Sequence, residues 1–238
     1  MVLCYTARMS FVDKVVLVTG AGRDLGRHLA QQFARDGARV VVNDVNPDTS
    51  AATVRAIEES GGKAMAIVAD VANKMAVQTM HYEILDTWGR VDILINHANV
   101  DPGGAALTLD EWAWDRALNV NLKGAFLCTQ TVGRSMKEQG GGVVVNMVGL
   151  PGERHSVALA ASTSGLFGFT RECAEEFAAY NILINAVFYG MPLAQWIAPS
   201  REAQVGQKTA DLVMFLSSLD PKSSRHTGEV FLASGEKY

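Results

Sequence analysis

The sequence has 238 residues, of which 48% are hydrophobic and 19% are charged, and its formal net charge is −4 at pH 7. This balance is typical of a globular protein with a sizeable core and excludes a largely disordered chain. The slight excess of acidic residues also argues against the basic surface that a nucleic acid or an anionic membrane would attract.

The first part of the sequence is predicted to alternate between strands and helices. In chain order it gives a strand over residues 15–18, a helix that ends before Gly37, a strand over 39–42, a helix over 48–59, a strand over 64–68, and a helix from its cap Asn73 to Trp88. Asn73 has a side chain that accepts hydrogen bonds from the free N–H groups at a helix start. Gly37 and Gly89 follow two of these helices, where glycine readily takes the left-handed conformation that ends a helix.

The same alternation continues along the rest of the sequence. It gives a strand over 92–96, a helical region from Thr108 to about Lys137, a strand over 143–147, a helix over 159–180, a strand over 182–187, a helix over 209–218 and a strand over 229–233. Thr108 and Glu111 have the spacing of a capping box, which predicts that Thr108 opens its helical region. Strands as apolar as these are buried on both faces, as parallel strands are. We therefore expect one α/β domain over residues 1–238, a Rossmann-type, doubly wound, mostly parallel seven-stranded sheet with helices on both faces.

Several features bear on the location of the protein. The first thirteen residues lack the apolar run of a signal peptide, and no later run is long enough to span a membrane, so we expect a cytoplasmic protein with no membrane partner. Residues 1–12 are expected to form a flexible N-terminal extension, and the sequence leaves open whether Met9 is the natural start. The cysteines Cys4, Cys128 and Cys173 are too few and too scattered for a disulfide framework or a metal site.

A glycine-rich turn lies between the first strand and the first helix. Its residues, Thr19 to Gly26, read TGAGRDLG. Glycines in this context let the backbone approach a pyrophosphate at a helix N-terminus, where free N–H groups and the helix dipole favour negative charge. Asp44 ends the second strand, and a carboxylate there can accept both ribose hydroxyls of NAD and would repel the 2′-phosphate of NADP. The alternative is a turn that only packs the strand on the helix.

These features resemble the short-chain dehydrogenase/reductase family, and the resemblance extends from Val15 to about Gly235. The turn resembles the TGxxxGxG motif of the family, Asp70-Val71 its adenine-contacting pair, and Asn96-His-Ala-Asn99 its NNAG motif. The resemblance implies NAD as cofactor and a cofactor site formed by Gly20, Gly22, Arg23, Asp24, Leu25, Gly26, Asp44, Asp70, Val71, Asn96, Ala98 and Gly190.

Two residues depart from the cofactor motifs of the family. Asp24 stands where the turn has its middle glycine, and Asn99 stands where NNAG has its last glycine. Because aspartate tolerates a positive φ better than most residues, we expect the turn to form. The carboxylate of Asp24 would lie close to the pyrophosphate, where Arg23, Arg27 or His28 can offset its charge. A cleft retained only as structure is the alternative to NAD binding.

The resemblance also implies four active-site positions, and three of them have changed. An active member uses a serine at the end of the fifth strand and a Tyr-x-x-x-Lys pair in the next helix, where this sequence has Gly149, Leu159 and Thr163. No tyrosine in the sequence is followed by lysine four residues later. Only Asn121 remains, and it can serve to hold a water and a helix kink. Without groups that transfer a proton, we expect alcohol–ketone hydride transfer to be lost.

Three hypotheses for the function follow. The first is a non-catalytic subunit that forms a homo-oligomer or a hetero-oligomer with an active paralogue, as the inactive subunits of two-subunit members of the family do. The resemblance implies that the helical regions 121–137 and 159–180 would form this interface. The second is an NAD(H)-dependent oxidoreductase of altered mechanism, with Glu153, His155 or Tyr189 as candidate groups. The third is a sensor that binds NAD(H) without turning it over. No histidines have the spacing of metal ligands.

Overall fold

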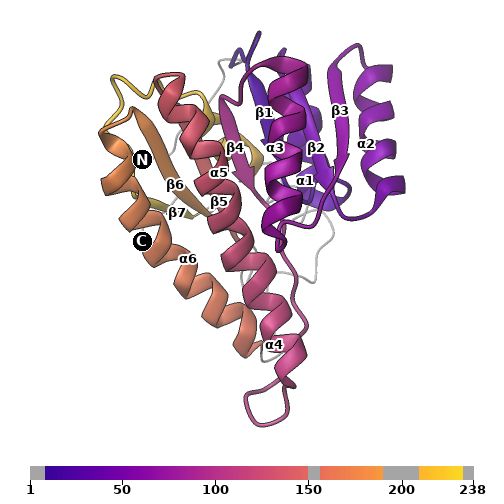
Figure 1. The fold of residues 1–238 in the computed structure, drawn as a ribbon, viewed down its shortest axis with the longest axis vertical. Helices are drawn as coiled ribbons and strands as arrows, with labels where there is room; N and C mark the ends of the chain where they lie inside the picture. Colours follow the sequence, from indigo (N-terminus) through magenta and orange to yellow (C-terminus); the bar gives the residue numbers. More distant parts are fainter. Residues whose placement is uncertain (1–8, 150–155, 190–208, 233–238) are drawn as a thin grey trace.

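The computed structural model describes residues 9–149, 156–189 and 209–232 (Figure 1). In chain order the elements are β1 (Val15–Val18), α1 (Asp24–Arg35), β2 (Arg39–Asp44), α2 (Pro47–Glu59), β3 (Lys63–Val68), α3 (Lys74–Trp88), β4 (Ile93–Asn96), α4 (Glu111–Leu118), the π-helix η1 (Asn119–Gly124), α5 (Ala125–Glu138), β5 (Gly142–Gly149), α6 (Val157–Ala178), β6 (Ile182–Tyr189) and β7 (Val230–Leu232). Residues 209–217 form a further helix before β7.

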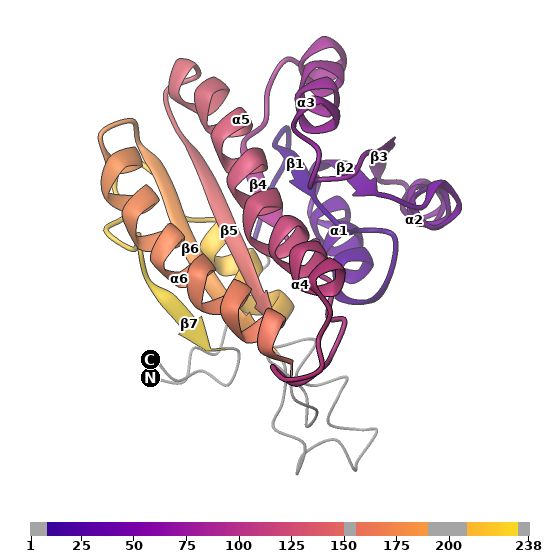
Figure 2. The same cartoon turned by 60° about the horizontal axis from the view of Figure 1, so that its bottom comes forward.

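The strands form one seven-stranded sheet in the order β3-β2-β1-β4-β5-β6-β7, and each pair in it is parallel. Alternate residues of β1 enter two separate cores. Val16 and Val18 pack in a cluster with Phe33 of α1, whereas Val15 and Leu17 pack in a cluster with helices α3 and α5. Figures 1 and 2 show α3, α5 and α6 together on one face of the sheet and α1 on the other. The predicted doubly wound fold is confirmed.

The helix α3 is capped at both ends as the sequence predicts. The Asn73 side chain accepts hydrogen bonds from the N–H groups of Met75 and Ala76, and Gly89 ends the helix with φ +76°. The predicted role of Thr108 is wrong. Asp110 caps α4 instead, because its carboxylate accepts a hydrogen bond from the Ala113 N–H at 2.8 Å. The Thr108 hydroxyl donates to the Ala105 carbonyl within the preceding turn.

The predicted helical region from Thr108 to Lys137 is interrupted by one π-helical turn, η1. Gly124, at the end of this turn, lies directly under Val71, and a β-carbon on Gly124 would be 2.8 Å from the Val71 Cγ2. The wider turn also places Asn121 on the inner side of the helix, with 8% of the residue exposed. The π-turn therefore brings this asparagine toward the ends of the strands.

Strands β5 and β6 extend two residues further than the sequence predicts. Their last register pairs are Val148 with Phe188 and Gly149 with Tyr189. The extension places Gly149 and Tyr189 side by side at the carboxyl edge of the sheet. The glycine turn after β1, Asp44 of β2 and the residues after β4 reach this same edge, where ligands bind in open parallel sheets.

None of the described helices has the length and apolar character needed to cross a membrane. Within the described ranges, no group of three or more His, Cys, Asp or Glu residues is arranged to hold a metal ion.

Candidate functional site

The glycine turn is fixed against the loop that follows β4. The buried Thr19 hydroxyl accepts hydrogen bonds from the N–H groups of His97 and Ala98, both at 3.0 Å. Gly20 has φ +64°, and a β-carbon on it would lie 2.9 Å from the Ala98 Cα. A side chain at position 20 would therefore push the two segments apart, which explains why the turn requires glycine there.

Gly22 is held from two sides. Its N–H donates to Oδ2 of Asp44 at 2.9 Å, and its carbonyl accepts from Nη2 of Arg27 at 2.7 Å. A β-carbon on Gly22 would lie 2.6 Å from the same Asp44 oxygen. The other Asp44 oxygen accepts from the Asn46 N–H at 3.0 Å. Each carboxylate oxygen retains capacity to accept a further hydrogen bond, which is what binding the two hydroxyls of a ribose requires.

Asp24 begins α1 with φ +49°, so the expectation that aspartate permits the turn is confirmed. Its side chain is 81% exposed and lies 3.8 Å from the Arg23 guanidinium. Of the other residues expected to offset its charge, Arg27 is bound to the Gly22 carbonyl and the Thr53 hydroxyl. His28 has a buried Nε2 without a hydrogen-bond partner. Arg23 is therefore the cation that the structure places beside the carboxylate.

Asp70 and Val71, which follow β3, have different surroundings. Asp70 is exposed and accepts a hydrogen bond from the Ala72 N–H at 2.9 Å. Val71 is 4% exposed and packs against Gly124. Val45 follows Asp44 in the sequence, and Val68 is the register partner of Asp44 on β3. Their side chains are 61% and 54% exposed. Apolar side chains therefore remain uncovered beside the Asp44 carboxylate, a feature that sequence reasoning did not identify.

Asn96, predicted to contact a cofactor, is buried in a polar network. Its Nδ2 donates to the Thr129 hydroxyl at 3.0 Å and to Oδ1 of Asn146 at 2.8 Å. Asn146 in turn donates to the Thr170 hydroxyl at 2.9 Å. The network joins β4 and β5 to helices α5 and α6, and it uses both N–H groups of the Asn96 amide.

Asn121 connects three segments. Its Oδ1 accepts from the Val100 N–H at 2.8 Å, and its Nδ2 donates to the Val100 carbonyl at 2.9 Å and to the Ser162 hydroxyl at 3.1 Å. These bonds join η1, the loop after β4 and α6, and they use both donors of the amide. The arrangement gives the Asn121 side chain a structural role in joining these three segments.

The three replaced positions lie together, as the resemblance implies. Gly149 ends β5, and its carbonyl accepts a hydrogen bond from the Thr163 hydroxyl at 3.2 Å. Leu159 is 3% exposed and Thr163 is 8% exposed. The cavity between these residues, Ala98 and Asn121 measures about 10 Å³, which is room for one water. None of the three side chains can transfer a proton at neutral pH.

Asn99 and Tyr189 fill the space beside Gly149. A β-carbon at position 149 would lie 2.7 Å from Nδ2 of Asn99 and 3.6 Å from the Tyr189 hydroxyl. Asn99 is hydrogen-bonded to that hydroxyl, and burial raises the pKa of Tyr189. The Tyr189 ring stacks on the His97 ring with centroids 6.0 Å apart. Burial lowers the pKa of His97. Both rings are therefore neutral near pH 7.

Other predicted candidates lie outside the described residues. They are Gly190, Glu153 and His155. Of the two described cysteines, Cys128 is buried and Cys173 is half-buried, and burial raises their pKa values to about 12 and about 11. Neither thiol is a nucleophile at neutral pH.

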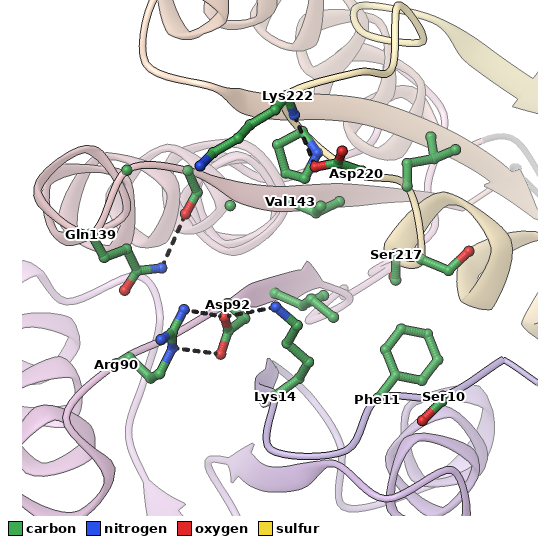
Figure 3. A pocket seen from close by; sticks show the side chains of 17 residues that line it. Ser10, Phe11, Lys14, Arg90, Asp92, Gln139, Val143, Ser217, Asp220 and Lys222 are labelled. Atoms are coloured by element: carbon green, nitrogen blue, oxygen red, sulfur yellow. Dashed lines mark hydrogen bonds and ion pairs between the residues drawn. The ribbon is translucent and has the colours of Figure 1, made fainter.

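A separate hollow of about 410 Å³ lies at the opposite edge of the sheet (Figure 3). The buried carboxylate of Asp92 forms one wall and accepts bonds from Arg90 at 2.6 and 3.0 Å and from the Val15 N–H at 2.9 Å. Lys14 lies 3.5 Å from the same carboxylate. Figure 3 shows Arg90 and Lys14 converging on Asp92 from either side. The cations are therefore bound to protein groups, and the cluster fixes the amino ends of β1 and β4.

A groove of about 280 Å³ runs between α5 and α6. Aromatic side chains from both helices line it, and Phe126 of α5 is 40% exposed with its ring edge-on to Phe169 of α6 at 6.2 Å. At the other end Lys137 lies 4.0 Å from the centre of the Tyr180 ring. An exposed aromatic groove between two long helices is typical of a protein interface.

Comparisons with known proteins agree with this architecture. The sequence profile of the short chain dehydrogenase family matches residues 14–204. The chain is 37% identical over 185 residues to the (2S)-[(R)-hydroxy(phenyl)methyl]succinyl-CoA dehydrogenase subunit BbsD of Thauera aromatica, covering 77% of this chain and 75% of that protein. It is 33% identical over 241 residues to a 3-oxoacyl-[acyl-carrier-protein] reductase of Synechocystis, covering 93% and 96%. The crystal structure of a short chain dehydrogenase from Mycobacterium smegmatis superposes with a TM-score of 0.83 at 28% identity, covering 96% and 94%.

Proposed function

The chain belongs to the short chain dehydrogenase family, and we propose that it is a non-catalytic member that acts as a subunit, paired with itself or with a catalytically active relative. The observation that carries this proposal is the hydrogen bond from the Thr163 hydroxyl to the Gly149 carbonyl. It joins two positions where an active member would hold a lysine and a serine. At the third position Leu159 stands where an active member would hold a tyrosine. General acid–base groups each contribute about 10²–10⁴-fold to a rate, so their joint loss removes the chemistry of the family.

The subunit role is supported by the groove between α5 and α6. Members of the family are commonly oligomeric, and one relative, from Thauera aromatica, is named as a dehydrogenase subunit. Phe126 and the aromatic residues around it would be covered by a second protein at this groove. Burial of such side chains supplies most of the free energy of association in protein interfaces.

A nicotinamide cofactor supplies a hydride when it is bound in this family. The residues at the adenosine end fit one, because Asp44 offers two carboxylate oxygens, and because Gly20, Gly22 and Gly26 let the turn pack closely against neighbouring segments where a β-carbon would clash. We propose that the ligand is of the NAD type, since the Asp44 carboxylate would repel the 2′-phosphate of NADP. A cytoplasmic location stays a prediction from the sequence.

Light scattering after gel filtration tests the subunit role. The purified chain, alone or co-expressed with a catalytically active relative from the same genome, should form a stable oligomer that Phe126→Asp converts to monomers. The matched control is Tyr82→Asp on α3, where the tyrosine is 73% exposed but lies away from the groove. A chain that is monomeric alone and does not retain the active relative would contradict the proposal.

One observation favours a second candidate, an oxidoreductase of altered mechanism. The Tyr189 hydroxyl lies 3.6 Å from the β-carbon position of residue 149, so a phenolic hydroxyl lies beside the altered site. A rate that depends on this hydroxyl would distinguish the second candidate from the first.

A further inference from the structure

The two ends of the cleft differ in what they can accept. At the β2–β3 end, Asp44 and its register partner Val68 lie side by side at the carboxyl edge of the sheet. Val68 and Val45 are exposed, and the Asp44 oxygens keep hydrogen-bonding capacity after binding the N–H groups of Gly22 and Asn46. An uncovered apolar surface beside a hydrogen-bonding carboxylate suits a planar base attached to a ribose.

The centre of the cleft is formed by the start of α1. Its first N–H groups have no partner within the helix, and the N-cap residue Arg23 makes no side-chain hydrogen bond to them. The exposed carboxylate of Asp24 opposes a phosphate at this point, and the guanidinium of Arg23 beside it offsets that charge. The centre can therefore accept a diphosphate, at lower affinity than a turn without Asp24 would give.

At the β5–β6 end, side chains of the described residues occupy the space beside position 149. A nicotinamide ring must lie next to the group that holds the reacting oxygen, which the family places at position 149. Here Nδ2 of Asn99 lies 2.7 Å from the β-carbon position of that residue, and the Tyr189 hydroxyl is hydrogen-bonded to Asn99. Tyr189 also stacks on His97, so its ring is held in place from the other side. Among the described residues, the cavity lined by Asn99, Gly149 and Leu159 measures about 10 Å³, which is room for one water and not for a pyridine ring.

We propose that the cleft binds the adenosine diphosphate portion of a dinucleotide and excludes the nicotinamide ring. The inference deepens the proposed function and rests on it only in assigning the cleft to a nucleotide of the NAD type. The nicotinamide end of NAD is then not held beside position 149 and contributes nothing to binding. The chain therefore binds NAD⁺, NADH and ADP-ribose with similar affinity, and it does not distinguish the oxidised cofactor from the reduced one.

Isothermal titration calorimetry with NAD⁺, NADH, ADP-ribose and nicotinamide mononucleotide tests this inference. The first three should bind with dissociation constants within about threefold of one another, a difference below ~0.7 kcal/mol. Nicotinamide mononucleotide should not bind. Asp44→Ala should abolish binding of the first three together. The double variant Asn99→Gly/Tyr189→Ala should bind NAD⁺ about tenfold more tightly than ADP-ribose, because the ring then gains a place.

Two results would overturn the inference. One is a wild-type chain that binds NAD⁺ at least about tenfold more tightly than ADP-ribose. The other is the absence of binding by either nucleotide at millimolar concentration. A control variant, Leu107→Ala, changes a side chain that is 98% exposed in the loop before α4 and should leave all affinities unchanged. These affinity ratios do not depend on turnover or oligomeric state, so the inference and the proposed function can fail separately.

Discussion

Asn99 and Gly149 fit each other: the Asn99 Nδ2 atom lies 2.7 Å from the point where a β-carbon on residue 149 would stand. Real β-carbons essentially never approach a heavy atom so closely, so any side chain at position 149 requires Asn99 to move. Both residues depart from the motifs of the family, one by gaining a side chain and the other by losing it. The two departures are therefore coupled.

Replacing Gly149 by serine should destabilise the protein. The added atoms meet the end of the half-buried Asn99 side chain, which has to shift, and we expect a cost near the lower end of the roughly 1–3 kcal/mol range of overpacking. Urea unfolding of Gly149→Ser measures the loss. In the background of Asn99→Gly the same substitution should cost less, with a coupling energy of about 0.5–3 kcal/mol in a double-mutant cycle. Additive effects of the two substitutions would show that the sites are independent.

Restoring the other two family residues should not restore activity. Leu159→Tyr and Thr163→Lys place a larger and a charged side chain around a cavity of about 10 Å³. We expect the double variant to be inactive and less stable by about 1–3 kcal/mol. The control, Ala160→Tyr with Ser164→Lys, puts the same side chains at the same spacing on the exposed face of α6. The midpoints of thermal unfolding of the two double variants are compared. Equal midpoints would contradict the tight packing around Leu159 and Thr163.

His81 should make the stability of the protein depend on pH. Its ring is buried between α3 and α5, with Nε2 bonded to the Ser135 hydroxyl at 3.0 Å, and burial lowers its pKa below the usual 6.5. The unfolded chain then binds more protons than the native one, so the free energy of unfolding falls as pH drops below about 6.5. The stability is fully present above that pH.

Urea unfolding between neutral and mildly acidic pH tests the role of His81. His81→Gln should reduce the loss of stability on acidification, because one group that charges only on unfolding is removed. Ser135→Ala is the control, since it removes the hydrogen bond and keeps the titrating ring. An unchanged pH dependence in His81→Gln would show that the ring does not contribute.

Asp92 should contribute more to stability than a surface ion pair does. Its side chain is 7% exposed and binds Arg90, Lys14 and the Val15 N–H. Asp92→Asn should lower the free energy of unfolding by about 1–3 kcal/mol. The loss is not larger because Arg90 and Lys14 are half-exposed, and solvent weakens their attraction to the carboxylate. Asp13→Asn is the control, since Asp13 is 81% exposed in its pair with Arg39 and should cost at most about 0.5 kcal/mol. Similar losses in urea unfolding would contradict this difference.

The fold was predictable because its local signals agree with its global arrangement. Asn73 and Gly89 cap α3 as predicted, and the central strands β1, β4 and β5 are buried on both faces, whereas the edge strand β3 is largely exposed. The errors fall where two local signals compete. Thr108 and Asp110 both have side chains that can cap a helix, and only the geometry of the preceding turn selects Asp110. The π-turn at 119–124 brings Gly124 close to Val71, a contact between distant segments that no local pattern reveals.

The site was predictable only in part. The resemblance identifies Gly149, Leu159 and Thr163 as one group, and the structure brings Gly149 and Thr163 into hydrogen-bond contact. It identifies Asn99 and Tyr189 as unusual residues, but not as partners. Their contact arises from the loop after β4 and the extended end of β6, which are about 90 residues apart in the sequence and meet only in the folded sheet.

The most direct test of the central claim is a steady-state assay of NADH oxidation and NAD⁺ reduction by the purified chain. The substrates should include 3-oxoacyl and 3-hydroxyacyl thioesters, with an active 3-oxoacyl reductase of the family as positive control. We predict no rate above the uncatalysed background for the wild type or for Tyr189→Phe. A measurable wild-type rate that Tyr189→Phe abolishes would contradict the non-catalytic assignment and establish Tyr189 as the proton donor of an altered enzyme.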